Sequence, residues 1–194
     1  MLITVEGLDG AGKTTLVGGL AAARPVIVLR EPGGVEVSER IRALVKEPGL
    51  AIDGRAEALL YAAARAQLVA ERLRPLLEAG ETVLLDRFVD SSLAYQGAGR
   101  GLGVDAVRAL NEFATGGLRP DRTLLLRLDP SVALARLTGA RDRLEREDLG
   151  FFAAVAAAYD ALAAAEPERF VVLDAARAPD AVVADALAAL DQPA

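Results

Sequence analysis

The sequence contains no cysteine and no histidine. Without cysteine the chain can form no disulfide framework and no thiolate metal site. Without histidine it lacks the usual acid–base residue and the commonest metal ligand, so any proton transfer has to use a carboxylate, a lysine or a tyrosine. Aromatic residues are also scarce, at 4% of 194 residues, while hydrophobic residues make up 53%. This composition predicts one domain with a core of alanine, leucine and valine.

Positive charge is limited as well. The formal net charge is −6, and Lys13 and Lys46 are the only lysines. Nonspecific nucleic-acid binding relies on a broad basic surface, so we expect no nucleic-acid partner, although arginines could still bind phosphates locally. The N-terminus has no basic leader region, and no apolar run approaches the length of a membrane span. We therefore expect no membrane association and a cytoplasmic location.

One stretch near the N-terminus fits the phosphate-loop pattern G-x-x-x-x-G-K-[ST]. It runs from Gly7 to Thr14, between a short apolar run and a helical segment at 13–23. Backbone N–H groups in such a loop surround phosphate oxygens, the lysine reaches the outer phosphates, and the Thr hydroxyl can ligate Mg²⁺. The positive end of the following helix points at the same anion. The residues expected to bind ATP are Gly7, Gly10, Ala11, Gly12, Lys13, Thr14 and Thr15.

Short apolar runs separated by helical stretches indicate a five-stranded parallel sheet covered by helices on both faces, as in the three-layer α/β sandwich of P-loop NTPases. The predicted strands are 2–5, 26–30, 82–86, 123–128 and 170–174. The predicted helices after the first are 35–46, 54–79 with a kink at Pro75, 104–114, 130–139, 149–165 and 179–191. Residues 97–103 and 138–148 are predicted to be irregular, and the second segment suits a lid on a single domain spanning 1–194.

Ligands bind at the carboxyl ends of parallel strands, so the residues after each strand carry the chemistry. Asp86 ends the third predicted strand, where an acid of a phosphate-loop protein sits near Mg²⁺; it could instead cap a helix or pair with Arg87. Arg87 could grip an acceptor phosphate with its planar guanidinium, or form a local ion pair with Asp90.

Two further groups of residues have both a functional and a structural interpretation. Tyr61 and Arg65 are spaced i, i+4, so a base could stack on the ring beside the guanidinium; the alternative is a core tyrosine with an arginine at the surface. The charged run 141–148 could be a solvated helix with i, i+4 ion pairs, or a lid whose arginines move onto a transferring phosphoryl group.

The pattern favours a kinase of small molecules. The chain lacks the Asn-Lys-x-Asp signature that would indicate a GTPase. A phosphate monoester acceptor, with a second pKa of about 6, is already ionised at neutral pH and needs arginines more than a base. A nucleoside or other acceptor, with Asp9 or Asp86 as base, remains an alternative. A nucleotide-binding regulatory switch without an acceptor is a further alternative.

Several motifs together resemble the thymidylate kinase family of bacterial type along nearly the whole chain. They are VEGLDGAGKTT (5–15), REPGG (30–34), LLYAAARAQL (59–68), DRFVDSSLAYQGAGRG (86–101), LRPD (118–121), DRLE (142–145) and VVLDA (171–175). The resemblance implies transfer of the γ-phosphate of ATP to dTMP, with Mg²⁺, by a homodimer.

The resemblance also implies roles for single residues. Asp9 falls near the 3′-hydroxyl and the phosphates, and Arg87 falls on the arginine that grips the acceptor phosphate and the donor γ-phosphate. The remaining matches surround the nucleoside: Tyr61 stacks on thymine, Arg65 meets the O4 of the base, Ser92 and Gln96 line the pocket, and Tyr95 packs where a ribose 2′-hydroxyl would be.

Members of that family take a catalytic arginine either from the phosphate loop or from the lid, and this chain resembles the second type. Gly10 and Ala11 leave the phosphate loop without an arginine, so the resemblance implies that the lid supplies it. Arg141 and Arg143 are then the candidates for the catalytic arginine. The adenine of ATP is expected between the lid and the loop at 175–178.

Overall fold

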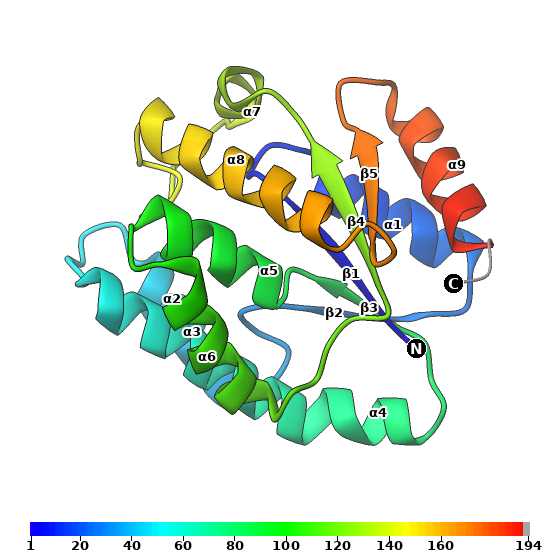
Figure 1. Cartoon of the computed structure of the whole chain (residues 1–194), viewed down its shortest axis with the longest axis horizontal. Coiled ribbons are helices and arrows are strands. Elements are labelled where there is room, and N and C mark those ends of the chain that lie inside the picture. The colour runs from blue at the N-terminus through cyan, green and yellow to red at the C-terminus, as the bar shows by residue number, and fades with distance from the viewer. Residues whose placement is uncertain (192–194) are drawn as a thin grey trace.

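The computed structural model describes residues 1–191, which form one parallel sheet with helices on both faces (Figure 1). The strand order is β2-β3-β1-β4-β5, and every pairing is parallel. The strands are β1 (Leu2–Gly7), β2 (Ile27–Arg30), β3 (Val83–Asp86), β4 (Arg122–Arg127) and β5 (Phe170–Asp174). The predicted α/β architecture is therefore confirmed, and each strand lies within two residues of its predicted bounds.

The helices follow the predicted order, except that the short helix at Val89–Ser92 was not predicted. They are α1 (Lys13–Ala23), α2 (Glu36–Lys46), α3 (Gly54–Leu68), α4 (Arg74–Glu78), α5 (Val89–Ser92), α6 (Val104–Thr115), α7 (Pro130–Arg136), α8 (Leu149–Ala165) and α9 (Pro179–Leu190). A π-helical turn, η1 (Val69–Leu73), joins α3 to α4, so the predicted helix over 54–79 is one rod in three parts. Pro75 lies in the first turn of α4, where its missing N–H has little cost.

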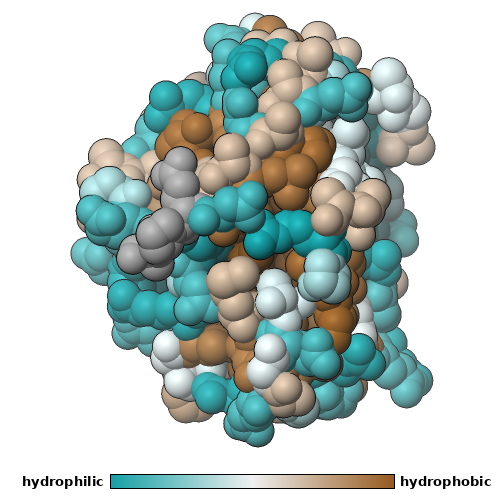
Figure 2. Space-filling view, turned by 90° about the vertical axis from the view of Figure 1, so that its right-hand side faces the viewer, coloured by the Kyte–Doolittle hydropathy of each residue, from teal (hydrophilic) through white to brown (hydrophobic). Residues whose placement is uncertain are grey.

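The helices form two outer layers around the sheet. Helices α1 and α9 pack together on one face, and α5 and α8 contact strands on the other. The two faces of a strand are filled alternately: Ile3 and Leu84 belong to the larger core, while Leu2, Val83 and Leu85 pack with the π-helical turn. On the side of the molecule shown in Figure 2, bands of hydrophilic residues interrupt the hydrophobic ones. Within residues 1–191, no helix is both long and apolar enough to cross a membrane.

Two predictions of local structure are wrong. The segment predicted as irregular from residue 97 begins inside a second π-helical stretch, η2 (Leu93–Gly99), which packs against α6 and α8. The helix predicted over 130–139 ends at Arg136, before Gly139, whose φ of 84° lies outside the helical region. No residue of the charged run 141–148 is helical, so the alternative of a solvated helix with i, i+4 pairs is wrong.

Candidate active site

A cleft of about 400 Å³ opens at the carboxyl ends of β1, β2 and β3. It joins the phosphate loop to the polar residues that follow the strands, as the doubly wound topology requires. Twelve of the residues singled out from the sequence line it, namely Asp9, Gly10, Gly12, Lys13, Thr14, Tyr61, Arg65, Asp86, Arg87, Ser92, Tyr95 and Gln96. Segments nearly ninety residues apart in the sequence thus meet in one cleft.

The phosphate loop has a backbone that only glycine adopts easily. The φ angles are 136° at Gly7, 82° at Gly10 and 95° at Gly12. At two of these positions space is also lacking: a Cβ would lie 2.6 Å from the Leu126 oxygen at Gly7 and 2.3 Å from the Ala133 oxygen at Gly10. The loop is therefore held between β4 and α7, in the shape that directs its N–H groups inward.

Helix α1 begins directly after the loop. The N–H of Leu16 donates to the Gly12 oxygen at 3.0 Å, the first bond of the helix. The N–H groups of Lys13, Thr14 and Thr15 precede that bond and lack an acceptor within the helix. These three amides lie at the positive end of the helix dipole, an arrangement that suits an anion.

Lys13 is folded back onto the loop. Its Nζ donates to the oxygens of Leu8 at 2.8 Å and Gly7 at 3.2 Å, and it lies 3.8 Å from a carboxylate oxygen of Asp9. Burial, reinforced by the charge of Arg87, lowers the pKa of Lys13 to about 8. A phosphate in the cleft would give this ammonium a second anion beside Asp9.

Asp9 and Arg87 connect the loop to β3. The guanidinium donates to Asp9 Oδ1 at 2.6 Å, and the hydroxyl of Tyr95 donates to Asp9 Oδ2 at 3.0 Å. Burial alone would raise the pKa of Asp9, but the charges of Arg87 and Lys13 hold it below its ordinary value. Arg87 has a φ of 68°, the only positive value outside glycine among the described residues. The local ion pair with Asp90 does not form, because Asp90 pairs with Arg169 at 2.6 Å.

A buried carboxylate that the sequence reasoning missed stands behind Arg87. Glu6 accepts from the Phe88 N–H at 2.7 Å, the Ser91 hydroxyl at 2.6 Å and the Tyr159 hydroxyl at 2.9 Å. Burial, together with the nearby charge of Asp90, raises the pKa of Glu6 to about 7. Ser91 in turn accepts from Arg87 at 2.9 Å. Glu6 thereby fixes the turn that presents Arg87 to the cleft.

Arg65, at the other end of the cleft, is 2% exposed, so the alternative of a surface arginine is wrong. Its Nε donates to Glu31 at 2.7 Å, Nη1 to Ser92 at 2.9 Å and also to Asn111, and Nη2 to the Phe88 oxygen at 2.9 Å. Four of its five N–H groups thus have acceptors among the described residues, which leaves one N–H of Nη2. Glu31 and Asn111 were not predicted from the sequence, because both lie on other elements.

The end of the cleft near Arg65 combines rings and amides. Tyr95 is 3% exposed and Gln96 is 2% exposed, and both come from the π-helical stretch η2. Tyr61, on α3, keeps part of its ring accessible to the cleft. Gln96 donates through Nε2 to Glu57 at 2.8 Å, which fixes its amide and aims its oxygen. A flat ring beside fixed amides and hydroxyls can hold a nucleobase.

The arginines in and next to the predicted lid take different directions. Arg136, at the end of α7, lines the cleft and donates to the Ala175 oxygen at 3.2 Å. The guanidinium of Arg141 donates to the Leu134 oxygen at 3.4 Å, and that of Arg143 pairs with Glu57. The structure therefore brings Arg136, which the sequence reasoning did not select, to the cleft, while Arg141 and Arg143 are not among its lining residues.

A smaller hollow of about 140 Å³ adjoins the phosphate loop on its other side. Ala11 and Thr15 line it, so these two predicted residues face this hollow rather than the main cleft. Arg136 and Gly12 line both spaces. Ala175 and Arg177, from the loop after β5, close the far side, where the sequence analysis expected the adenine.

Comparisons with known proteins agree on one family. A family model described as thymidylate kinase matches residues 5–186. The chain is 50% identical to a thymidylate kinase of Deinococcus radiodurans, covering 99% of this chain and 97% of the relative. A thymidylate kinase of Lactobacillus delbrueckii is 48% identical, over 94% of this chain and 91% of the relative. The crystal structure of thymidylate kinase from Ehrlichia chaffeensis superimposes with a TM-score of 0.81 at 28% identity, covering 99% of this chain and 98% of the other.

Proposed function

The chain belongs to the thymidylate kinase family, and from that premise we propose how its residues divide the transfer of the γ-phosphate of ATP to dTMP. The product is dTDP, and the reaction is a step in dTTP synthesis. ATP is the co-substrate. The roles of individual residues, the metal, the assembly and the location in the cell form the proposal.

The observation that carries the assignment of roles is the meeting of Lys13 and Arg87 at Asp9, where the phosphate loop opens into the acceptor pocket. Two anions have to be held together for phosphoryl transfer, and both cations are within reach of the same point. We assign the donor phosphates to Lys13 and the loop amides. We assign the acceptor phosphate to Arg87, which would exchange Asp9 for a phosphate oxygen.

The base of dTMP fits the opposite end of the cleft. Tyr61 offers the stacking ring, and the remaining N–H of Arg65 is available to the O4 oxygen of thymine. Ser92 and Gln96 supply polar contacts on the pocket wall, and Tyr95, bonded to Asp9, occupies space at the sugar. This arrangement favours a deoxyribonucleotide with an oxygen at the base position that Arg65 reaches.

The donor side suits Mg²⁺. Asp86 Oδ1 is buried without a hydrogen-bond partner among residues 1–191, and Thr14 lines the same cleft. A hard cation with oxygen ligands would satisfy that orphaned oxygen, directly or through water. We therefore propose that Thr14 and Asp86 hold Mg²⁺, which neutralises phosphate charge when bound.

We propose that the lid, residues 138–148, brings positive charge to the donor phosphates. Arg136, at its base, lines both the main cleft and the hollow assigned to adenine, so it is the lid-side cation closest to the donor phosphates in this arrangement. Arg141 and Arg143 would reach the phosphates only after the lid rearranges, because both guanidinium groups point elsewhere.

We further propose a homodimer that packs through α3 and α6. These two helices pack against each other (Figure 1). Each has an exposed large apolar side chain: Leu59 on α3 is 58% exposed and Phe113 on α6 is 89% exposed. Burial of these two side chains against a second copy of the chain would remove apolar surface from water. Phe113→Glu should convert a dimer to a monomer in sedimentation analysis; a wild-type monomer would contradict the assembly.

We propose a cytoplasmic location because ATP and dTMP are nucleotides of the cell interior.

The decisive experiment is an ADP-release assay with ATP and Mg²⁺, in which dTMP, dUMP, UMP, dCMP, dGMP and thymidine are offered in turn. The proposed pocket predicts turnover with dTMP far above the others, and a loss of that preference in Arg65→Ala. Turnover with thymidine but not dTMP would contradict the assignment of Arg87 to an acceptor phosphate and would assign a base role to Asp9 or Asp86.

A further inference from the structure

One buried carboxylate joins the lid to the acceptor pocket. Glu57, on α3, is 0% exposed. From the pocket it accepts a hydrogen bond from Gln96, at 2.8 Å, and from the lid it accepts one from Arg143. Arg100, from the loop after η2, pairs with the same carboxylate at 3.1 Å. A single side chain thus contacts two segments that belong to different parts of the proposed mechanism.

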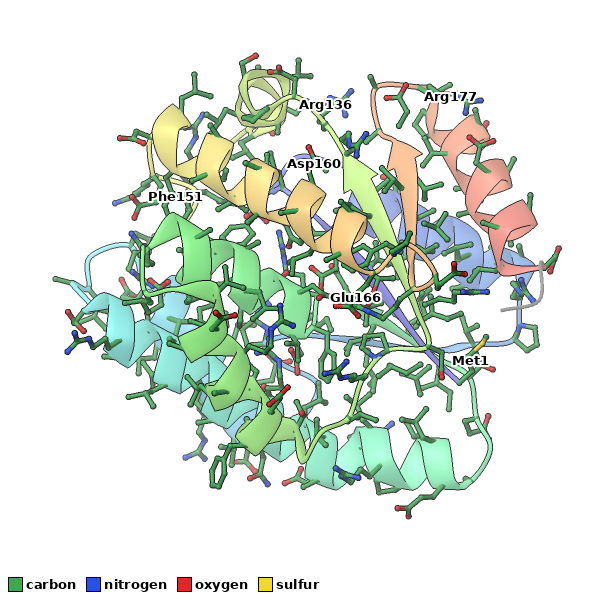
Figure 3. All side chains as sticks on the ribbon, in the orientation of Figure 1. Met1, Arg136, Phe151, Asp160, Glu166 and Arg177 are labelled. Carbon is green, nitrogen blue, oxygen red and sulfur yellow. The ribbon has the colours of Figure 1, made fainter. Side chains whose placement is uncertain are left out.

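The lid has further contacts with the same side of the cleft. Arg143 also donates through Nε to the Val45 oxygen at 3.1 Å, and Asp142 pairs with Lys46 at 2.6 Å. Arg100 extends the link, because its Nη1 pairs with Glu147 at 2.6 Å while its guanidinium lies over the ring of Phe151, 4.9 Å from the centroid. Phe151 lies at the start of α8, directly after the lid (Figure 3).

Charge balance makes this link conditional on the position of the lid. A carboxylate with no exposure is stable only with cationic partners and filled hydrogen bonds. Arg100 supplies one cation from the body of the protein, and Arg143 supplies the second from the lid. If the lid moves away, Glu57 loses one of its two cations, and the carboxylate that fixes the Gln96 amide is free to shift.

We propose that Glu57 is a positioning residue that couples closure of the lid to binding of the acceptor base, through Arg143 on one side and Gln96 on the other. This inference rests on the proposed placement of the base beside Tyr61 and Gln96. An acceptor that holds Gln96 in place also holds Glu57 where Arg143 meets it, so the acceptor and the closed lid stabilise each other. Arg143 then anchors the lid instead of contacting the transferring phosphate.

The first test is Glu57→Gln, which keeps the shape of the side chain and removes its charge. We expect KM for dTMP to rise about tenfold and KM for ATP to rise in parallel, because the closed state becomes a smaller fraction of the population. A purely structural role would lower the amount of active enzyme and leave both KM values unchanged. The matched control is Glu36→Gln, which breaks an exposed Glu–Arg pair with Arg40 and should change neither constant.

The second test uses Arg143→Gln, which removes only the lid partner and leaves Arg100 on Glu57. It should reproduce the rise in KM for dTMP, although Arg143 itself does not line the cleft. The double variant Glu57→Gln/Arg143→Gln should be no worse than either single variant, because both break one interaction. This arm keeps the proposal testable if Glu57→Gln fails to fold.

The third test observes the lid itself. Because the chain has no cysteine, Ala140→Cys on the exposed lid gives a single site for a nitroxide label. In the wild-type background, dTMP should reduce the motion of the label, and Glu57→Gln should abolish that effect. Unchanged KM values in Glu57→Gln and Arg143→Gln would overturn the proposal, as would a mobile lid with an unchanged KM for dTMP. An error in the placement of the base would appear separately, as an unchanged KM for dTMP in Gln96→Ala.

Discussion

Each end of the cleft is built on an arginine, yet the two guanidinium groups are held in different ways. Arg65 is 2% exposed, and fixed protein acceptors take four of its N–H groups. The side chain of Arg87 is 15% exposed, and its main partner, Asp9, is itself 25% exposed and faces the cleft. Arg65 is thus part of the pocket wall, whereas Arg87 can exchange its partner for a ligand. Arg65 therefore shapes the site, whereas Arg87 is placed to bind the ligand.

The largest effect we expect is on Arg87. Arg87→Ala should lower kcat/KM for dTMP about 10³-fold, since an arginine at the transferring phosphate is worth that much or more. Steady-state kinetics measures the loss, and a urea titration shows whether the fold is retained. Arg87→Lys, which keeps the charge but loses the bidentate geometry, is the control and should recover part of the activity. A decrease below about tenfold in Arg87→Ala would mean that Arg87, like Arg65, is part of the pocket wall.

A substitution of Arg65 should act mainly on the free energy of unfolding. Arg65→Met leaves Glu31 buried without its cation, so unfolding should become easier by about 3 kcal/mol or more. The double variant Arg65→Met/Glu31→Gln removes both charges and should recover a large part of that loss, as measured by urea unfolding. If the double variant is as unstable as the single one, the buried pair is not the source of the loss.

Substitution of Arg136 tests whether this arginine binds the ligand, as we propose for Arg87, or is part of the wall, like Arg65. Arg136 lines the cleft, and among residues 1–191 its guanidinium has one acceptor, the Ala175 oxygen, so we expect it to act on the ligand. Arg136→Ala should lower kcat about 10²-fold, with KM for dTMP little changed. Arg141→Ala and Arg143→Ala belong in the same series. A larger loss of kcat in either of these would mean that the lid rearranges before transfer.

The smallest effect concerns the pH dependence of ATP binding. The pKa of Lys13 in the free protein is about 8, and bound phosphates favour the charged ammonium. Below that pH Lys13 is charged with and without ATP, so its titration does not affect affinity. Above it the free protein loses the proton that binding requires, and Kd for ATP should rise by up to about tenfold per pH unit. Calorimetric titrations should show no such rise in Lys13→Met, whose affinity is lower throughout; equal slopes would contradict the assignment to Lys13.

The sequence was sufficient for features that depend on local pattern. The phosphate loop, the five strands and the acid–arginine pair at the end of β3 all follow from spacing and from the position of polar residues after apolar runs. The resemblance to a family then supplied the pocket residues Ser92, Tyr95 and Gln96, which spacing alone does not select. All of them line the cleft.

The sequence could not predict features that depend on partners from distant elements. Glu6 reads as one residue of a buried strand, and its role depends on Ser91 and Tyr159, 85 and 153 positions away. Glu57 reads as an ordinary acid in the first turn of a helix, yet it is fully buried because three distant side chains converge on it. In the lid, i, i+4 spacing suggested helical ion pairs, but contacts to α2 and α3 prevailed. Tertiary partners, rather than propensity, decided these positions.

The contact of Gly10 with Ala133 also limits how this enzyme can change by mutation. At position 10 any side chain would meet a backbone oxygen 2.3 Å from its Cβ, and that oxygen belongs to α7, the helix that carries Arg136. A substitution of Gly10 would therefore have to be accompanied by a shift of α7. The shape of the phosphate loop at Gly10 and the position of the helix that carries Arg136 are therefore linked, and a side chain at position 10 requires a change in both.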